Sequence, residues 1–387
     1  MTLLKDMEKQ LGAAVVGRKA LIRSIMRAAL AQEHIFIKGD PGTAKSMLIE
    51  SFLGLLEGSR GFVELMNKFT TPKETLGPEK VSSFKNDENE RNLIGHLGDC
   101  HYALLDEFFK GSSAIINATL RMMQERRIGN GVDMSTKTKR MVDTPLRMIL
   151  AASNEVPEPG MLDAAYDRFL VRCEVDTLKD RRLIKKMCFG GIKKVSPVGR
   201  LEDMDLESEK AMQLPFTTAA QEAYLDMLSA IQKDDIHVGN RRQIKSLKLA
   251  QAEAHLCGAP EVAPEHLCAV ADSLWSRCTK ERNKVKQLVL KHTNPDKLLI
   301  EQFTDQLDKY DAEPSDLTSV KAKRIAEITD MVAKTQNLSE STDKTDLLRR
   351  LADTQANIQA IAISGGSSQV DEIQQRLQDR VRESVGV

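Results

Sequence analysis

The chain has 387 residues, of which 41% are hydrophobic, and this predicts two or three domains of a globular protein with a substantial core. Lys plus Arg and Asp plus Glu both number 56, so the formal net charge is zero. This charge balance argues against a broad positive field that binds nucleic-acid phosphates without sequence preference. The chain begins MTLLKDMEKQLG, without the apolar stretch of a signal peptide, and no segment approaches the roughly 20 apolar residues of a membrane span. We therefore expect a cytoplasmic protein without a membrane segment.

Five short apolar runs predict strands in the first half of the chain, and helical sequence precedes the first of them. Helical or loop sequence separates each run from the next. Short strands that alternate with helices predict an α/β fold with a mainly parallel sheet covered by helices on both faces. The runs are residues 34–38, 62–66, 102–105, 147–152 and 170–175.

Strand signals stop after about residue 180, and the rest of the chain has helical periodicity. We expect an α/β nucleotide-binding core over residues 1–190, a linker over 191–212, an all-α domain over 213–294 and a helical C-terminal extension over 295–387. The expected helices are 216–231, 242–257, 264–289, 298–307, 320–332 and 347–361, followed by an amphipathic stretch over 370–381.

The six cysteines have none of the CxxC spacing that builds a zinc site or a redox pair. We expect most of them to be small buried residues in a reducing compartment. The triplet His255-Leu256-Cys257 recurs as His266-Leu267-Cys268. Residues two apart on a helix point about 200° away from each other, so neither triplet presents both side chains to one metal ion.

The first predicted strand runs directly into a loop with the P-loop pattern G-x-x-x-x-G-K-S, in which Ala44 replaces the second glycine. This position enters the first turn of the following helix, where an alanine is not strained. Backbone N–H groups of such a loop and the helix N-terminus face phosphate oxygens. Lys45 should reach the β- and γ-phosphates of ATP, and the Ser46 hydroxyl should bind Mg²⁺. The predicted phosphate-binding residues are Gly39, Asp40, Pro41, Gly42, Thr43, Ala44, Lys45 and Ser46.

Two further predicted strands end in polar residues that suit hydrolysis of the bound nucleotide. The run 102–105 leads into Asp106 and Glu107, of which Asp106 could hold Mg²⁺ through a water molecule and Glu107 could polarise the attacking water. The run 147–152 leads into Ser153 and Asn154, and the Asn154 amide could orient the same water. A turn-forming role for Asn154 is an equal alternative from the residues alone.

The segment Asp167-Arg168-Phe169 could supply an arginine that reaches the nucleotide of a neighbouring subunit. A surface salt bridge is the alternative for an isolated Asp-Arg-Phe.

The order of these motifs resembles AAA+ ATPases, and several segments are similar to the MoxR family, closest to its RavA branch. The similarity covers roughly residues 10 to 280 and is dense in the first 175. The segments that carry it are 69–74, 76–78, 104–107, 122–126, 151–155 and 165–168.

The resemblance assigns roles to individual residues. It implies that Asn154 is the first sensor, that Arg168 is the arginine finger with Arg172 as the substitute, and that Arg241 is the sensor of a lid domain with Arg242 as the alternative. It also implies hairpin insertions at 80–97 and 127–144. The RavA branch carries a β-containing insertion near its C-terminus, which residues 295–387 do not match because they are predicted to be helical throughout.

We therefore expect an ATP-hydrolysing homo-oligomeric ring, for which the resemblance implies six subunits, that remodels or activates a protein partner in the manner of a chaperone. The resemblance suggests a partner with a von Willebrand A domain or another protein client, and nucleic acid is not the expected partner. The alternatives are a DNA-remodelling motor of the same class, with contacts at 137–140, and a nucleotide-regulated scaffold with little turnover.

Overall fold

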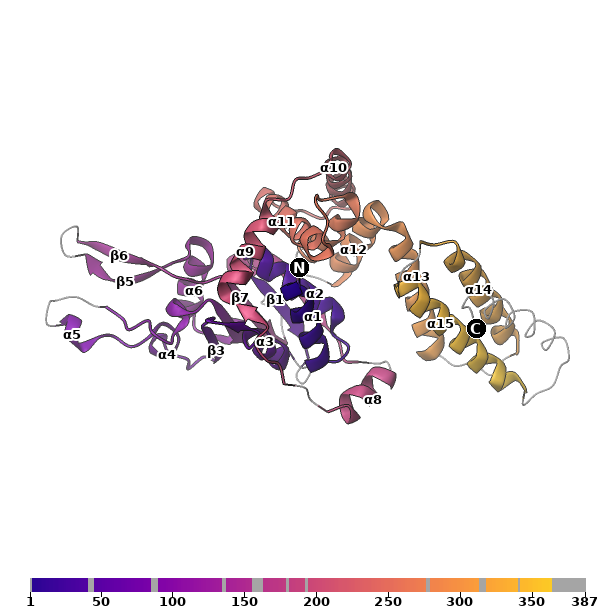
Figure 1. The fold of residues 1–387 in the computed structure, drawn as a ribbon, viewed down its shortest axis with the longest axis horizontal. Coiled ribbons are helices and arrows are strands. Elements are labelled where there is room, and N and C mark those ends of the chain that lie inside the picture. Colours follow the sequence, from indigo (N-terminus) through magenta and orange to yellow (C-terminus); the bar gives the residue numbers. More distant parts are fainter. Residues whose placement is uncertain are drawn as a thin grey trace. The chain divides into compact units, whose positions relative to one another are not determined.

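The computed structural model describes residues 2–40, 45–84, 90–133, 137–154, 163–178, 181–191, 194–275, 279–312, 318–339 and 342–363. The chain forms two compact units, residues 1–289 and residues 290–387. Figure 1 follows the chain through the first unit, which holds the sheet, into the helices of the second. The expected domain bounds at 190, 212 and 294 stay predictions.

A five-stranded parallel sheet forms the centre of the first unit, in the order β3-β4-β7-β1-β8. All five predicted strands are confirmed. β1, β4, β7 and β8 are largely buried on both faces, whereas the edge strand β3 leaves Val63 and Leu65 exposed. The register aligns the carboxyl ends of the strands, with Asp106 opposite Ala152 and Lys38 opposite Ser153. The strands are β1 (Ile35–Gly39), β3 (Gly61–Leu65), β4 (Tyr102–Asp106), β7 (Met148–Ser153) and β8 (Val171–Val175).

Alternate residues of the strands enter two separate hydrophobic clusters, one on each face of the sheet. Ile35 and Ile37 pack in the cluster that includes α1 (Thr2–Ala14), α2 (Lys19–Ala31) and α3 (Lys45–Leu53). Phe36 packs on the opposite face, in the cluster that includes α6 (Ser113–Glu125) and α7 (Asp163–Arg168). Its ring lies 5.2 to 5.8 Å from those of Phe109, Tyr166 and Phe169. Such aromatic pairs contribute about 1 kcal/mol each beyond their buried area.

Both expected insertions are present, and they project from the same side of the unit (Figure 1). The second is an antiparallel hairpin of β5 (Arg127–Asp133) and β6 (Thr138–Asp143), as expected. The first has one antiparallel bridge between Glu79 and Arg91 and a short helix α5 (Val81–Phe84), and residues 85–89 lie outside the described part. Short elements beside the strands are β2 (Leu56–Glu57), α4 (Pro72–Leu76), η1 (Leu97–Asp99) and η2 (Phe108–Lys110).

The helices after β8 begin earlier than the sequence indicates. Residues 191–212, expected to be a linker, include β9 (Gly199–Arg200) and the helix α9 (Leu201–Met212), whose Leu201 and Met204 lie in the core cluster of the sheet. The expected helix 264–289 is two elements, η3 (Pro264–Asp272) and α12 (Thr279–Thr293), with residues 276–278 outside the described part. The remaining elements are α8 (Arg181–Phe189), α10 (Thr218–Lys233) and α11 (Asn240–Cys257).

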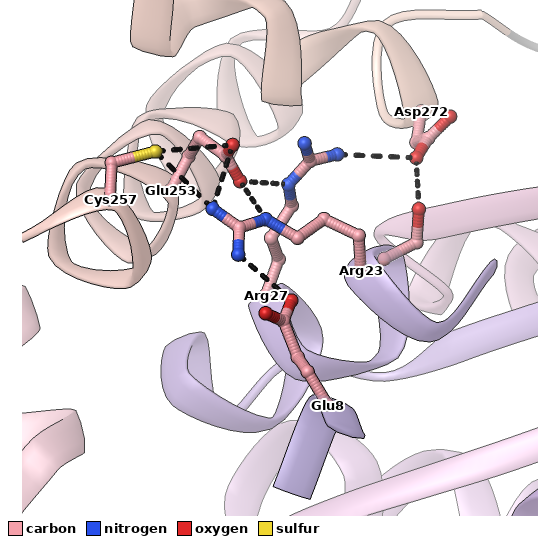
Figure 2. Close-up of polar contacts among 7 residues, drawn as sticks. Glu8, Arg23, Arg27, Glu253, Cys257 and Asp272 are labelled. Atoms are coloured by element: carbon pink, nitrogen blue, oxygen red, sulfur yellow. Dashed lines mark hydrogen bonds and ion pairs between the residues drawn. The ribbon is translucent and has the colours of Figure 1, made fainter. Parts of the chain in front are cut away.

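An ion-pair network joins α11 and η3 to α2 (Figure 2). The Glu253 carboxylate of α11 accepts hydrogen bonds from Arg23 at 3.0 Å and from Arg27 at 2.6 Å. Arg27 also lies 3.9 Å from Asp272 of η3. The network fixes the C-terminal half of α11 against the N-terminal helices.

The second unit has its own small core, and its described residues are helical as expected. Its buried side chains include Leu307, Ile328 and Leu351, one from each helix. The amphipathic stretch expected at 370–381 lies outside the described residues. No helix in the described part of either unit is long and apolar enough to cross a membrane. The helices are α13 (Pro295–Ala312), α14 (Thr318–Gln336) and α15 (Thr342–Ile363).

Candidate functional site

Polar side chains gather at the carboxyl ends of three neighbouring strands. β1 ends at Gly39, β4 at Asp106 and β7 at Ser153, and these strands are adjacent in the sheet. Parallel strands place their carboxyl ends at one edge, where open α/β sheets bind their ligands. The edge therefore unites residues that lie far apart in the sequence.

β1 ends at Gly39, the first residue of the P-loop, and α3 begins at Lys45, while Pro41, Gly42, Thr43 and Ala44 lie outside the described residues. Lys45 begins α3, and its ammonium group donates hydrogen bonds to the carbonyl oxygens of Gly39 and of Asp40, the latter at 3.0 Å. The lysine thus reaches back over its own loop. Burial lowers the pKa of Lys45, although Asp106, Glu107 and Asp40 act in the opposite direction.

Ser46 and Asp106 form a pair that fits Mg²⁺. The Ser46 hydroxyl donates a hydrogen bond to Asp106 Oδ2 over 2.9 Å. Two adjacent oxygen ligands of an octahedral Mg²⁺, each about 2.1 Å from the ion, lie about 3.0 Å apart. A hydroxyl and a carboxylate at this separation are therefore spaced to share one ion without a large rearrangement.

Glu107 adopts an unusual backbone conformation at the start of η2. Its φ is 52° and its ψ is 38°, in the left-handed region that costs energy for a residue with a side chain. The Glu107 N–H donates to Asp106 Oδ1 at 3.0 Å, and the carboxylate lies 3.3 Å from Lys110 Nζ. Such strain is typical of functional sites, and here it turns the carboxylate to the same edge as Asp106.

Asn154 follows β7 beside Glu107. The preceding Ser153 hydroxyl donates to Glu107 Oε2 at 3.1 Å, which joins the ends of β4 and β7. Asn154 Oδ1 is buried and has no hydrogen-bond partner among the described residues. A buried amide oxygen without a partner loses free energy unless a ligand or water donates to it. Asn154 therefore suits a role at the nucleotide.

The structure separates Arg168 from Arg172. Arg168 ends α7 and is half-buried, with hydrogen bonds to Ala164 O at 3.1 Å and to Gln124 Oε1 at 3.2 Å. Arg172 is 2% exposed, donates to Trp275 O at 2.7 Å and stacks 4.1 Å above the Tyr166 ring. Burial lowers the pKa of Arg172 to about 9, and nearby Arg242 adds to the effect. Arg172 is thus engaged in the interior, whereas Arg168 is more accessible.

Arg241 and Arg242 differ in the same way, and both lie in the first turn of α11. Arg241 is exposed, whereas Arg242 is 8% exposed and donates to carbonyl oxygens that precede β8. In the register of the sheet Val171 lies opposite Ile35, and Val175 lies opposite Gly39.

The first turn of α11 therefore lies at the amino end of the sheet. At about 3.3 Å per residue, this end is about 13 Å from the Gly39 end. The structure brings Lys45, Ser46, Asp106, Glu107 and Asn154 to one edge. It places Arg168 and the first turn of α11, which carries Arg241, near the amino end of the sheet.

Sequence reasoning missed some contacts at the site and overestimated the burial of the cysteines. Ser153 and Lys110 both contact Glu107. In the sequence, only the polar end of the strand 147–152 pointed to Ser153, and nothing pointed to Lys110. Cys188 and Cys257 are exposed, contrary to expectation. Within the described residues no group of three His, Cys, Asp or Glu side chains could hold a metal ion.

Comparison with known proteins identifies a family and several relatives. Residues 2–213 match the family model described as the MoxR domain in the MoxR-vWA-beta-propeller ternary systems. An uncharacterised protein of Methanocaldococcus jannaschii is 31% identical over 278 residues, which are 71% of this chain and 70% of that protein.

Chaperone MoxR1 of Mycobacterium tuberculosis is 24% identical over 181 residues, which are 45% of each chain. Among solved structures, a candidate ATPase from Cytophaga hutchinsonii superposes with a TM-score of 0.59 at 17% identity. The superposition covers 76% of this chain and 94% of that one. This last likeness supports the fold alone.

Proposed function

The chain belongs to the MoxR family of AAA+ ATPases, and from this premise we propose that it is an ATP-hydrolysing motor that remodels or activates a protein partner. The observation that carries the proposal is the meeting of the Ser46 hydroxyl, the Asp106 carboxylate and the strained Glu107 at one edge of the sheet. A phosphate-binding loop alone would support nucleotide binding. The Glu107 carboxylate, placed beside the Ser46 and Asp106 side chains that would hold Mg²⁺, supports hydrolysis.

Nucleotide binding exchanges contacts that the protein makes with itself. Lys45 Nζ leaves the carbonyl oxygens of Gly39 and Asp40 for the β- and γ-phosphates. The backbone N–H groups of the loop donate to the same phosphate oxygens. Ser46 and Asp106 would hold Mg²⁺, which supplies positive charge that neutralises the phosphate oxygens. Burial lowers the pKa of Lys45, and phosphate oxygens beside the ammonium group would act in the opposite direction and favour its charged form.

Hydrolysis requires a water molecule held in line with the γ-phosphate. Glu107 accepts a proton from this water, and the unpartnered Oδ1 of Asn154 accepts a hydrogen bond from it. The Ser153 hydroxyl and the Lys110 ammonium group hold the Glu107 carboxylate in place. General-base action of this kind contributes about 10²- to 10⁴-fold to the rate.

Arg168 completes the site of a neighbouring subunit in this proposal. Support comes from its position at the amino end of the sheet, away from its own Lys45. An arginine supplied across an interface stabilises transition-state charge and contributes about 10³-fold or more. Arg241 lies at the same end, so we assign its charge to the neighbouring site as well. We propose a homo-oligomeric ring, with six subunits as the expected number.

The partner is proposed from the family. The matching family model names ternary systems of MoxR, a von Willebrand A protein and a beta-propeller protein, so we propose a client with a von Willebrand A domain. One relative carries the name chaperone, which supports remodelling of a protein. Closeness to the RavA branch stays a prediction. The use of ATP with Mg²⁺, the cytoplasmic location and the site shared between subunits also stay predictions.

The Glu107→Gln substitution tests hydrolysis directly. Steady-state phosphate release should fall by about 10²-fold or more, while binding of a fluorescent ATP analogue is retained, because glutamine cannot accept the proton. Glu125→Gln is the matched control, since Glu125 lies 4.0 Å from Arg121 at the surface and is half-exposed. Equal hydrolysis by wild type and Glu107→Gln would remove the assignment.

A further inference from the structure

Arg242 makes an unusually complete set of hydrogen bonds for a side chain of the helical domain. Its guanidinium donates to the carbonyl oxygens of Leu170 at 3.0 Å, Ser273 at 2.9 Å, Asp167 at 2.9 Å and Phe169 at 3.3 Å. It also donates to Asp167 Oδ1 at 2.9 Å. Because the side chain is 8% exposed, these bonds are protected from competition with water.

The acceptors of Arg242 lie on both sides of Arg168 in the sequence. α7 ends at Arg168, and the last four carbonyl groups of a helix have no partner within it. Arg242 satisfies the carbonyl of Asp167 before Arg168 and those of Phe169 and Leu170 after it. Arg242, which lies 75 residues after Asp167 in the chain, therefore holds the backbone that carries Arg168.

A second buried arginine contacts the same segment. Arg172 donates to Tyr166 O at 3.2 Å and to Trp275 O at 2.7 Å, and it lies 3.7 Å from Asp167 Oδ1. Two cations so close together repel, and the Asp167 carboxylate, shared between them, offsets this repulsion. Asp167 thus accepts a hydrogen bond from Arg242 with its backbone carbonyl, and its carboxylate supplies the negative charge between Arg172 and Arg242.

Two hydrogen-bond partners of the Arg168 side chain lie among the described residues. They are the helical carbonyl of Ala164 and the exposed Gln124. Its direction therefore depends on the backbone at the end of α7. The helix that supplies Arg242 is also anchored at its other end, where Glu253 binds Arg23 and Arg27 (Figure 2).

We propose that Arg242, together with Asp167, is a positioning residue for Arg168 and holds it ready for the site of the neighbouring subunit. This inference rests on the proposed function, in which Arg168 acts across a subunit interface. Arg242 touches no nucleotide in this account and acts through the end of α7. A displacement of about 1 Å in a positioned group can cost about 10²-fold in rate.

The substitution that tests this is Arg242→Lys, because lysine keeps the charge but cannot reach the separate acceptors at once. We expect kcat to fall by about 10²-fold, with the dissociation constant of a fluorescent ATP analogue unchanged. In an Arg168→Ala background the same substitution should cause no further loss of kcat. Arg147→Lys is the matched control, since Arg147 forms a paired contact with Asp205 at 2.9 Å away from α7, and it should leave kcat unchanged.

Mixed assemblies distinguish the positioning role from a role at the subunit's own nucleotide. Arg242→Lys subunits have an intact P-loop, and Lys45→Ala subunits have an intact Arg168. Turnover of the mixture should exceed that of either variant alone, as it should for Arg168→Ala mixed with Lys45→Ala. Rescue of Arg168→Ala without rescue of Arg242→Lys would overturn the positioning role and leave the shared site standing. Failure of both would overturn the shared site and the positioning role with it.

An equal loss of kcat from Arg242→Lys in the wild-type and Arg168→Ala backgrounds would also overturn the inference. If Arg242→Lys does not fold, Asp167→Asn provides the test, because it removes the charge but keeps the backbone carbonyl that Arg242 contacts. A smaller fall in kcat that vanishes in the Arg168→Ala background would support the inference. A fall that persists there would refute it.

Discussion

The Glu253→Gln substitution removes the charge at the centre of the network that seats α11 on α2. Glu253 is 8% exposed and accepts hydrogen bonds from Arg23 at 3.0 Å and from Arg27 at 2.6 Å (Figure 2). Glutamine has nearly the same shape, but it presents one acceptor oxygen and no charge. The substitution therefore leaves Arg27 buried without its principal counter-charge.

The expected magnitude follows from the pKa of Glu253. Burial alone would raise this pKa, but Arg27 and Arg23 outweigh burial and lower it from 4.5 to about 2. At about 1.4 kcal/mol per pKa unit, this lowering corresponds to about 3 kcal/mol in the free energy of unfolding. The loss agrees with the roughly 3 to 5 kcal/mol that breaking a buried ion pair costs. At about 2 to 4 °C per kcal/mol, the melting temperature should fall by about 6 to 12 °C.

Thermal unfolding at pH 7, followed by circular dichroism, measures this loss. Glu8→Gln is the control, because Glu8 contacts Arg23 at 2.8 Å but is 31% exposed, and such pairs contribute about 1 kcal/mol or less. The stabilisation from a carboxyl with a lowered pKa is present above its unfolded value and disappears as the pH falls toward the folded value. The difference between wild type and Glu253→Gln should therefore shrink between about pH 5 and pH 2. Equal melting temperatures for Glu253→Gln and Glu8→Gln at pH 7 would refute this reasoning.

Two other substitutions test the candidate Mg²⁺ ligands and the contact between the two insertions. Asp106→Asn should raise the Mg²⁺ concentration needed for nucleotide binding by about tenfold or more, measured by Mg²⁺ titration of a fluorescent ATP analogue, and an unchanged titration would contradict the assignment. Asn130 of the hairpin accepts a hydrogen bond from the Arg91 N–H at 2.6 Å, so Asn130→Ala should destabilise this junction locally by about 1 to 3 kcal/mol. Hydrogen exchange of the Arg91 amide should accelerate, and unchanged exchange would show that Asn130 does not join the two insertions.

The parts of the fold that the sequence predicts are those that local periodicity determines. Each strand is a short apolar run, and parallel pairing then requires Asp106, Glu107 and Asn154 to meet at one edge. The sequence does not predict α9, because its residues are mostly polar and its burial comes from tertiary contacts with the core. The left-handed backbone of Glu107 also has no local signal.

The arginines show most clearly what sequence leaves open. Arg241 and Arg242 are neighbours in one helical turn, and only the packing of α11 decides that the first is exposed and the second buried. Arg168 and Arg172 are separated in the same way, since Arg172 alternates with apolar residues inside β8 while Arg168 ends a helix. A charge within a strand of buried residues is the one sequence signal that indicates an interior role.

Turnover of mixed Arg168→Ala and Lys45→Ala subunits tests the central claim, an ATP site shared between subunits, most directly. Each variant alone should hydrolyse ATP at least about 10²-fold more slowly than wild type, because one lacks the charge at the transition state and the other the phosphate contact. Mixing should restore turnover well above either parent, since an intact P-loop then meets an intact Arg168. A mixture that is no more active than the average of its parents would contradict the shared site.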